Sequence, residues 1–221
     1  MAFVLFLLKM ASIGRDFRLK LTSKKTFKVV KYLLENFQTN QLVVSQKTGV
    51  AYSRVNEVVN FLSDLGIVSK GWRRCTLEDP VRLLEAIALE RPLNRLVKSS
   101  FRLEVTSVRE GEEMLRRASQ DRGVRYALTV FSGLRRFYEY HIAYPSIHSY
   151  VSDVGVEREA PHGEGPITLF LLLPDHSDIL KTVRNVDEFS VCDPIQVAID
   201  LFCSGVGRDA AVKFLEVVRR G

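Results

Sequence analysis

Apolar residues recur with a helical period three times in the first third of the chain. The first stripe covers 24–37, a second short helix fits 41–48, and a third covers 53–65. Ser53 is typical of a helix N-cap, and Gly66 is typical of the residue that ends a helix. These patterns predict three consecutive helices, with a tight turn before the third.

The residues that follow alternate in a different way. Ile67–Lys70 and Trp72–Leu77 have the composition of two short strands on either side of a turn at Gly71. Basic residues gather near the tip of this hairpin: Lys70, Arg73 and Arg74. Three helices and a hairpin predict a winged helix-turn-helix over 22–78, in which the third helix lies in the major groove of DNA.

The charge distribution favours the same interpretation. The whole chain has 32 basic and 26 acidic residues, a net charge of +6. Residues 1–78 hold 13 basic and 5 acidic residues, a net charge of +8, and residues 79–221 hold 19 and 21, a net charge of −2. A phosphate backbone requires such a basic surface, whereas a protein partner does not. We therefore expect double-stranded DNA as the partner of the first third.

A helical projection of the third helix turns its polar residues outward, away from Val55. Asparagine can pair with adenine, arginine with guanine and glutamate with cytosine, whereas lysine, serine and tyrosine more often contact phosphates. The residues expected to contact DNA from the second helix, the third helix and the hairpin are Lys47, Tyr52, Ser53, Arg54, Asn56, Glu57, Asn60, Lys70, Arg73 and Arg74. Lysines of the first helix are expected to support the contact with the DNA backbone.

Two stretches carry a resemblance to a known class of regulators. Gly49–Val55 and Leu62–Val68 are similar to the winged-helix domains of MarR-type and related prokaryotic transcription regulators. The similar segment covers 43–77. This resemblance implies a DNA-binding regulator, and it does not identify an operator.

The remaining two-thirds predict a different architecture. Asp79-Pro80 opens a connector helix, placed at 79–98, whose apolar stripe runs as far as a break at Arg91-Pro92. An α/β partner or sensor domain with a mixed sheet fills 99–221. Strands are expected at 101–105, 126–130, 147–151 and 167–173, with helices at 112–119, through Leu134 and Phe137, at 194–202 and at 208–218. The fold class expected for the whole chain is thus multi-domain α/β.

Two motifs in this larger part resemble a second family. Tyr126–Leu134 contains YALT-x-FS-x-L, and Val191–Leu201 contains DP-x-Q-x-x-x-DL. Both are similar to AbiEi-type transcriptional regulators, the antitoxin side of type IV toxin–antitoxin systems. The resemblance implies a repressor or autoregulating antitoxin-like protein, a toxin protein as partner, and a second domain with nucleotidyltransferase-like topology.

That topology raises the alternative of an enzyme. Nucleotidyl transfer needs a phosphate-cradling turn, which Thr129–Gly133 could imitate, and a carboxylate pair that holds divalent metal. The strand expected to carry the pair, 148–153, offers only Asp153, and Asp175–Asp178 falls in an expected loop. We therefore expect no enzyme activity, no catalytic residue, no metal and no cofactor. A module that binds proteins rather than DNA is the other alternative.

The N-terminal segment 1–21 is an apolar extension with three open interpretations. Phe3–Leu8 fits an extra strand, a helix packed on a dimer partner, or residues upstream of a true start at Met10. It lacks the basic region and cleavage site of a signal peptide, and no stretch approaches the length of a membrane span. Three widely spaced cysteines provide no disulfide framework. From these features we expect a cytoplasmic protein without membrane contact. We also expect a homodimer, because paired recognition helices double the contacts with DNA.

Overall fold

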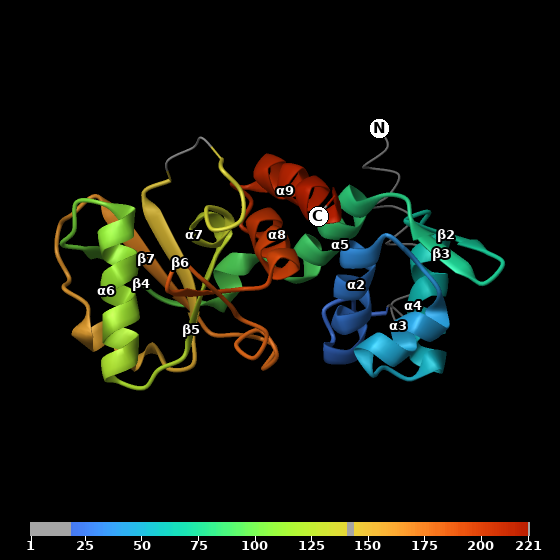
Figure 1. Ribbon diagram of the computed structural model, residues 1–221, viewed down its shortest axis with the longest axis horizontal. Helices are drawn as coiled ribbons and strands as arrows, with labels where there is room; N and C mark the ends of the chain where they lie inside the picture. The colour runs from blue at the N-terminus through green and yellow to red at the C-terminus, as the bar shows by residue number, and fades with distance from the viewer. Residues whose placement is uncertain (1–18, 141–143, 221) are drawn as a thin grey trace. The chain divides into compact units, whose positions relative to one another are not determined.

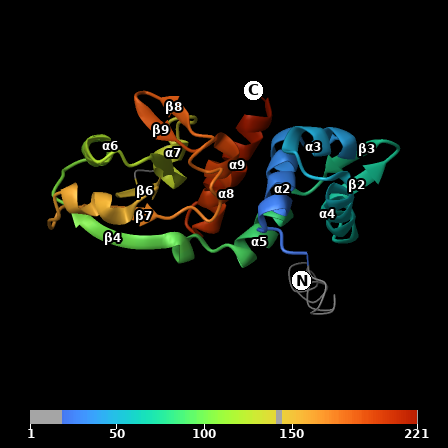
Figure 2. The same cartoon turned by 90° about the horizontal axis from the view of Figure 1, so that it is seen from below.

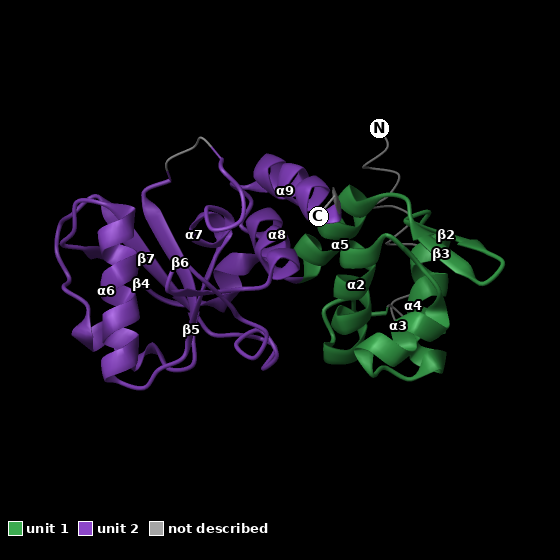
Figure 3. Cartoon of the chain, viewed as in Figure 1, with its two compact units in different colours: residues 1–90 green, residues 91–221 purple. Residues whose placement is uncertain are grey.

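A computed structural model of the chain describes residues 19–140 and 144–220. The chain divides into two compact units, residues 1–90 and 91–221 (Figure 3). Most of the apolar extension, residues 1–18, lies outside the described residues. No helix in the described part of the chain is long and apolar enough to cross a bilayer.

The first unit contains the three helices that the apolar stripes predict. They are α2 (Lys24–Asn36), α3 (Gln41–Thr48) and α4 (Tyr52–Asp64) (Figure 1). Gly49 ends α3 with a φ of 67°, a left-handed conformation that residues with a side chain rarely adopt. The turn between α3 and α4 can therefore be short.

The N-terminus of α4 differs from the prediction. Ala51, not Ser53, is the N-cap residue, and Ser53 lies within the first turn of the helix. The helical hydrogen bonds begin at Ala51, whose backbone oxygen accepts from Arg54 N at 2.9 Å and from Val55 N at 3.1 Å. Ala51 has no side chain that can accept hydrogen bonds from the first N–H groups of α4.

Three short strands complete this part of the unit in the order β1-β3-β2: β1 (Gln38–Thr39), β2 (Val68–Gly71) and β3 (Arg74–Leu77). The hairpin of β2 and β3 is confirmed, but Gly71 pairs with Arg74, so the turn is Trp72-Arg73. The prediction that Trp72 begins the second strand was wrong. Strand β1 was not predicted, because two residues are too few to show alternation.

The helix after the hairpin also belongs to the first unit. Helix α5 (Pro80–Glu90) is joined to the start of the described chain by Glu90, whose Oε2 accepts hydrogen bonds from Thr22 N and Oγ1, both at 3.1 Å. The expected break at Arg91-Pro92 is present, since α5 ends at Glu90, and the helix therefore does not fill the whole segment 79–98. Pro92 interrupts it, since proline cannot donate the hydrogen bond that would continue a helix, and a separate 3₁₀ turn, η1 (Leu93–Leu96), follows.

The second unit is a mixed α/β structure, as expected. Its six strands are ordered β4-β7-β6-β5-β9-β8, with the pairs β7-β6 and β5-β9 parallel and the other three pairs antiparallel. The elements are β4 (Val97–Leu103), α6 (Val108–Asp121), β5 (Tyr126–Thr129), α7 (Val130–Leu134), β6 (Ser146–Val151), η2 (Val154–Glu159), β7 (Ile167–Leu172), β8 (Arg184–Val186), β9 (Phe189–Val191), α8 (Pro194–Cys203) and α9 (Arg208–Arg220). The β8-β9 hairpin was not predicted.

Helices cover this sheet. Helices α8 and α9 pack side by side, as Figures 1 and 2 both show, and α7 packs on α8. Gly133 permits this approach, because a Cβ there would lie 2.8 Å from a methyl group of Val197. Val130, the first residue of α7, has a φ of 54°, an unfavourable conformation for a β-branched residue. The YALT motif therefore ends in a tight, fully buried turn.

His148 of β6 makes the second unit sensitive to acid. Its ring stacks on Phe170 with 4.5 Å between ring centroids, and burial lowers the pKa of His148 to about 4. The unfolded chain binds a proton near pH 6.5, so between pH 6.5 and 4 only the unfolded state is protonated at this residue. The contribution of the neutral His148 ring to the free energy of unfolding is therefore complete above pH 6.5. It is lost progressively as the pH falls from 6.5 to 4.

We expect this residue to cost the native state up to about 3 kcal/mol at pH 4, from about 1.4 kcal/mol per pH unit. The measurement is the free energy of unfolding in urea at pH 7 and pH 4.5. His148→Phe keeps a ring against Phe170 and should lose less stability between the two pH values than the natural chain. An equal loss in both proteins would contradict the assignment.

Candidate nucleic-acid interface

Helix α4 has one buried and one polar face. Val55, Val58, Val59 and Leu62 are fully buried, which fixes the rotation of the helix. The opposite face carries the polar residues that the helical projection turned outward: Tyr52, Ser53, Asn56 and Glu57 are exposed, and Arg54 and Asn60 are half-buried. The structure thus places the predicted contact residues of α4 along one side of the helix.

Two of these residues are not free in the unbound protein. Arg54 Nη1 donates to Glu57 Oε2 at 2.7 Å, one helical turn away. The pair is exposed to water, and such pairs contribute only about 0–1 kcal/mol, so a polar ligand could separate the two side chains at small cost. The sequence projection could not show this pairing.

A second contact joins α4 to the hairpin. Lys70 Nζ donates to Asn60 Oδ1 at 2.6 Å. At the base of the hairpin, Ser69 Oγ donates to Glu78 Oε1 at 2.5 Å. The hairpin therefore keeps a defined position beside the polar face of α4, although both views show it projecting from the helices (Figures 1 and 2).

A groove of about 1080 Å³ lies between the hairpin and the N-termini of α3 and α4. It is lined by Asn40, Gln41, Leu42, Tyr52, Lys70, Gly71, Trp72, Arg73 and Arg74. Four of the predicted contact residues therefore come together here, namely Tyr52, Lys70, Arg73 and Arg74. The other six lie outside the groove: five on α4, and Lys47 in the last turn of α3.

Sequence reasoning missed the residue at the tip of the hairpin. Trp72 is 89% exposed, and Arg73, with a φ of 53°, places its guanidinium carbon 5.8 Å from the indole centroid. The turn position was the available signal, since a residue in a two-residue hairpin turn projects away from any core. Asn40, Gln41 and Leu42 were missed because the predicted second helix gave no reason to place its start beside the hairpin.

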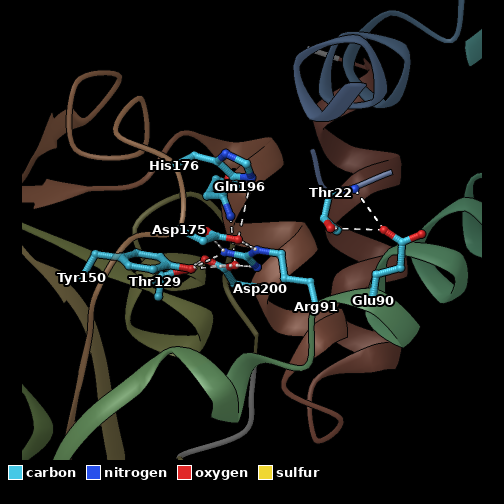
Figure 4. A network of polar contacts seen from close by, with 9 residues as sticks. All are labelled: Thr22, Glu90, Arg91, Thr129, Tyr150, Asp175, His176, Gln196 and Asp200. Carbon is cyan, nitrogen blue, oxygen red and sulfur yellow. Dashed lines mark hydrogen bonds and ion pairs between the residues drawn. The ribbon is translucent and has the colours of Figure 1, made fainter. Parts of the chain in front are cut away.

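The second unit contains a buried polar network around Arg91 (Figure 4). Its guanidinium donates to Asp175 through Nε at 2.8 Å and Nη2 at 3.1 Å, and to Asp200 through Nη1 at 2.8 Å. The Arg91 side chain is 3% exposed, Asp200 is fully buried, and Asp175 is 24% exposed. A two-point contact of this kind fixes the guanidinium plane.

Three neutral groups complete the network at Asp200. Thr129 Oγ1 donates to Asp200 Oδ2 at 2.7 Å, and Gln196 Nε2 and Tyr150 OH donate to Oδ1 at 2.9 and 3.1 Å. Arg91 Nη2 also donates to Tyr150 OH at 2.7 Å. The two sequence motifs thus meet in space, because Thr129 ends YALT and Gln196 and Asp200 belong to DP-x-Q-x-x-x-DL.

The network determines the charges of its members. Burial opposes the positive charge of Arg91, but Tyr150, Asp200 and Asp175 outweigh it and raise the pKa of Arg91 well above its usual value. Burial would also raise the pKa of Asp175, yet the hydrogen bonds and charge of Arg91 lower it. At neutral pH, Arg91 and Asp175 are therefore a charged pair.

No protein-family model, curated protein or solved structure matches this chain. The similarities to MarR-type and AbiEi-type regulators therefore stay predictions from short motifs.

The network also bears on the enzyme alternative. Asp200 contacts Thr129 of the Thr129–Gly133 turn, but the guanidinium of Arg91 lies between Asp200 and Asp175. Within residues 19–140 and 144–220, no three His, Cys, Asp or Glu side chains are grouped as metal ligands. Asp175, which the sequence analysis placed in a loop, contacts the guanidinium of Arg91 through both carboxylate oxygens.

The three cysteines are buried, and none of them forms a disulfide. Burial raises the pKa of Cys75, and raises that of Cys203 to about 12, so both thiols stay protonated at neutral pH. A protonated, buried thiol is a poor nucleophile.

Proposed function

We propose that the chain is a sequence-specific transcriptional regulator that binds double-stranded DNA through a winged helix in its first unit. The observation that carries this proposal is the polar face of α4 beside a basic hairpin, with the groove between them. Base edges are read by polar side chains on a rigid helix, and phosphates are held by cations next to it. Both kinds of group are present on one side of this unit.

In this arrangement α4 enters the major groove and the hairpin follows the backbone. Asn56 and Arg54 are the residues expected to read bases, and Lys70, Arg73 and Arg74 the residues expected to hold phosphates. The first N–H groups of α4 support this orientation, since Ala51 cannot cap them and a helix N-terminus attracts phosphate.

The second unit is proposed to serve partner contact, dimerisation or sensing. The resemblance to AbiEi-type proteins supports an autoregulating antitoxin-like repressor with a toxin protein as partner, and the nucleotidyltransferase-like topology rests on the same resemblance. A reading frame for a nucleotidyltransferase-like toxin beside this gene would support the antitoxin role, and its absence would favour a stand-alone regulator.

Binding to DNA is tested directly by electrophoretic mobility shift. The full chain is titrated at low salt against a duplex taken from the region upstream of its own gene. We expect a retarded band that an unrelated duplex competes away poorly. The absence of any retarded band at low salt would refute the regulator hypothesis and favour a module that binds protein.

Substitutions at base contacts and at phosphate contacts should affect DNA binding differently. Asn56→Ala should lower the ratio of affinities for the upstream duplex and an unrelated duplex, by about 1–3 kcal/mol for a lost pair of base contacts. Lys70→Ala should weaken both duplexes alike and make binding less sensitive to salt. Since Lys70 also contacts Asn60, Arg74→Ala is the matched control for charge alone. Identical behaviour of Asn56→Ala and Lys70→Ala would place α4 outside the major groove.

A further inference from the structure

The hairpin tip exposes the largest apolar side chain of the first unit. Trp72 is 89% exposed, and Leu42 and Tyr52, which line the same groove, are 57% and 53% exposed. Exposed apolar surface that is gathered in one place, beside charged residues, is typical of an interaction site. Phosphate contact needs the cations of the hairpin but does not need an indole ring.

The charges around Trp72 identify the kind of partner. Lys70, Arg73 and Arg74 line the groove with it, and no carboxylate is among the described residues that line it. A second copy of the chain that presented this same face would bring three more cations against these three. Nucleic acid combines the negative charge and the flat apolar surfaces that such a lining fits.

We propose that Trp72 is a wedge that stacks its indole against the bases of bound duplex DNA, so that the duplex opens and bends at that step. The proposal rests on the proposed function and adds a specific contact to it. Apolar side chains inserted between base pairs unstack them locally and kink the duplex. Arg73, beside the ring, is placed to hold the adjacent phosphate.

The chain offers a direct signal for this contact, because Trp72 is its one tryptophan. The full chain is titrated with a mixed-sequence duplex two helical turns long, while anisotropy of the labelled duplex reports binding and indole emission reports stacking. We expect the duplex to quench the emission. Heparin, a polyanion without bases, should bind by charge and leave the emission unchanged.

Variants separate stacking from charge. Trp72→Ala should bind the duplex about 10-fold more weakly, the effect of one lost aromatic stacking contact. Trp72→Phe should keep most of the affinity, and Trp72→Lys should behave like the alanine variant although it adds a cation. Because the side chain is exposed, all three variants should unfold like the natural chain.

The outcomes distinguish this proposal from the proposed function. Binding of the duplex with unchanged emission, and with equal affinity for Trp72→Ala, would overturn the wedge and leave DNA binding intact. An emission change that follows protein concentration without DNA would assign Trp72 to contact between copies of the chain and overturn the wedge. No duplex binding at low salt would overturn both.

Discussion

Replacing Arg91 with methionine should destabilise the second unit by about 3–5 kcal/mol, the cost of removing one partner from a buried ion pair. The variant would leave Asp200 fully buried without a cation, and Asp175 without its two-point partner. Methionine keeps the length of the side chain, so the loss reports charge and hydrogen bonds more than volume. The measurement is urea unfolding followed by far-ultraviolet circular dichroism, which detects helices of both units.

Three comparisons sharpen this expectation. Asp200→Asn should cost less than Arg91→Met, because Arg91 keeps Asp175 and the amide oxygen can still accept hydrogen bonds. Arg95→Met removes an exposed arginine four residues away and should change stability by less than about 0.5 kcal/mol. The deficit of Arg91→Met should also shrink as the pH falls, since protonation neutralises an isolated buried carboxylate. If Arg91→Met loses no more free energy of unfolding than Arg95→Met, the Arg91 network contributes little to the stability of the second unit.

The helices of the first unit could be predicted because their signals are local. The bounds of α3 agree with the sequence, since Gly49 marks its end independently of any distant contact. The N-cap was predicted at Ser53, two residues too late, because the backbone oxygen of Ala51 already accepts the first helical hydrogen bonds and a side-chain preference at Ser53 does not show this. Trp72 was assigned to a strand, since an apolar residue beside an alternating segment looks like part of it, and only the pairing of Gly71 with Arg74 shows the turn.

The network in the second unit could not be predicted, because its members are distant in sequence. Arg91 and Asp200 are 109 positions apart, and Thr129 and Asp200 are 71 apart. The two motifs that contain Thr129 and Asp200 did indicate unusual positions, but the residue that joins them, Arg91, looked like the residue before a helix-breaking proline. Spacing alone does not pair an arginine with an aspartate in another element.

The phosphate contacts of the hairpin predict the largest effect on binding. A triple variant replaces Lys70, Arg73 and Arg74 with alanine. Its slope of log affinity against log salt concentration should be shallower than that of the natural chain by about 2.7, since each phosphate contact contributes about 0.9. The affinity at low salt should fall for every duplex, whether or not it contains the upstream sequence. Fluorescence anisotropy of a labelled duplex over a series of salt concentrations measures both quantities.

The matched control removes the same charge from the second unit. Lys98, Arg117 and Arg125 are exposed there, and their triple alanine variant has the same net charge as the hairpin variant. If DNA is held at the hairpin, the control should keep the slope of the natural chain, because the slope reports only the cations that contact phosphates. Equal slopes for the two variants would instead mean that DNA responds to total charge, and that the hairpin of the first unit has no special part in binding.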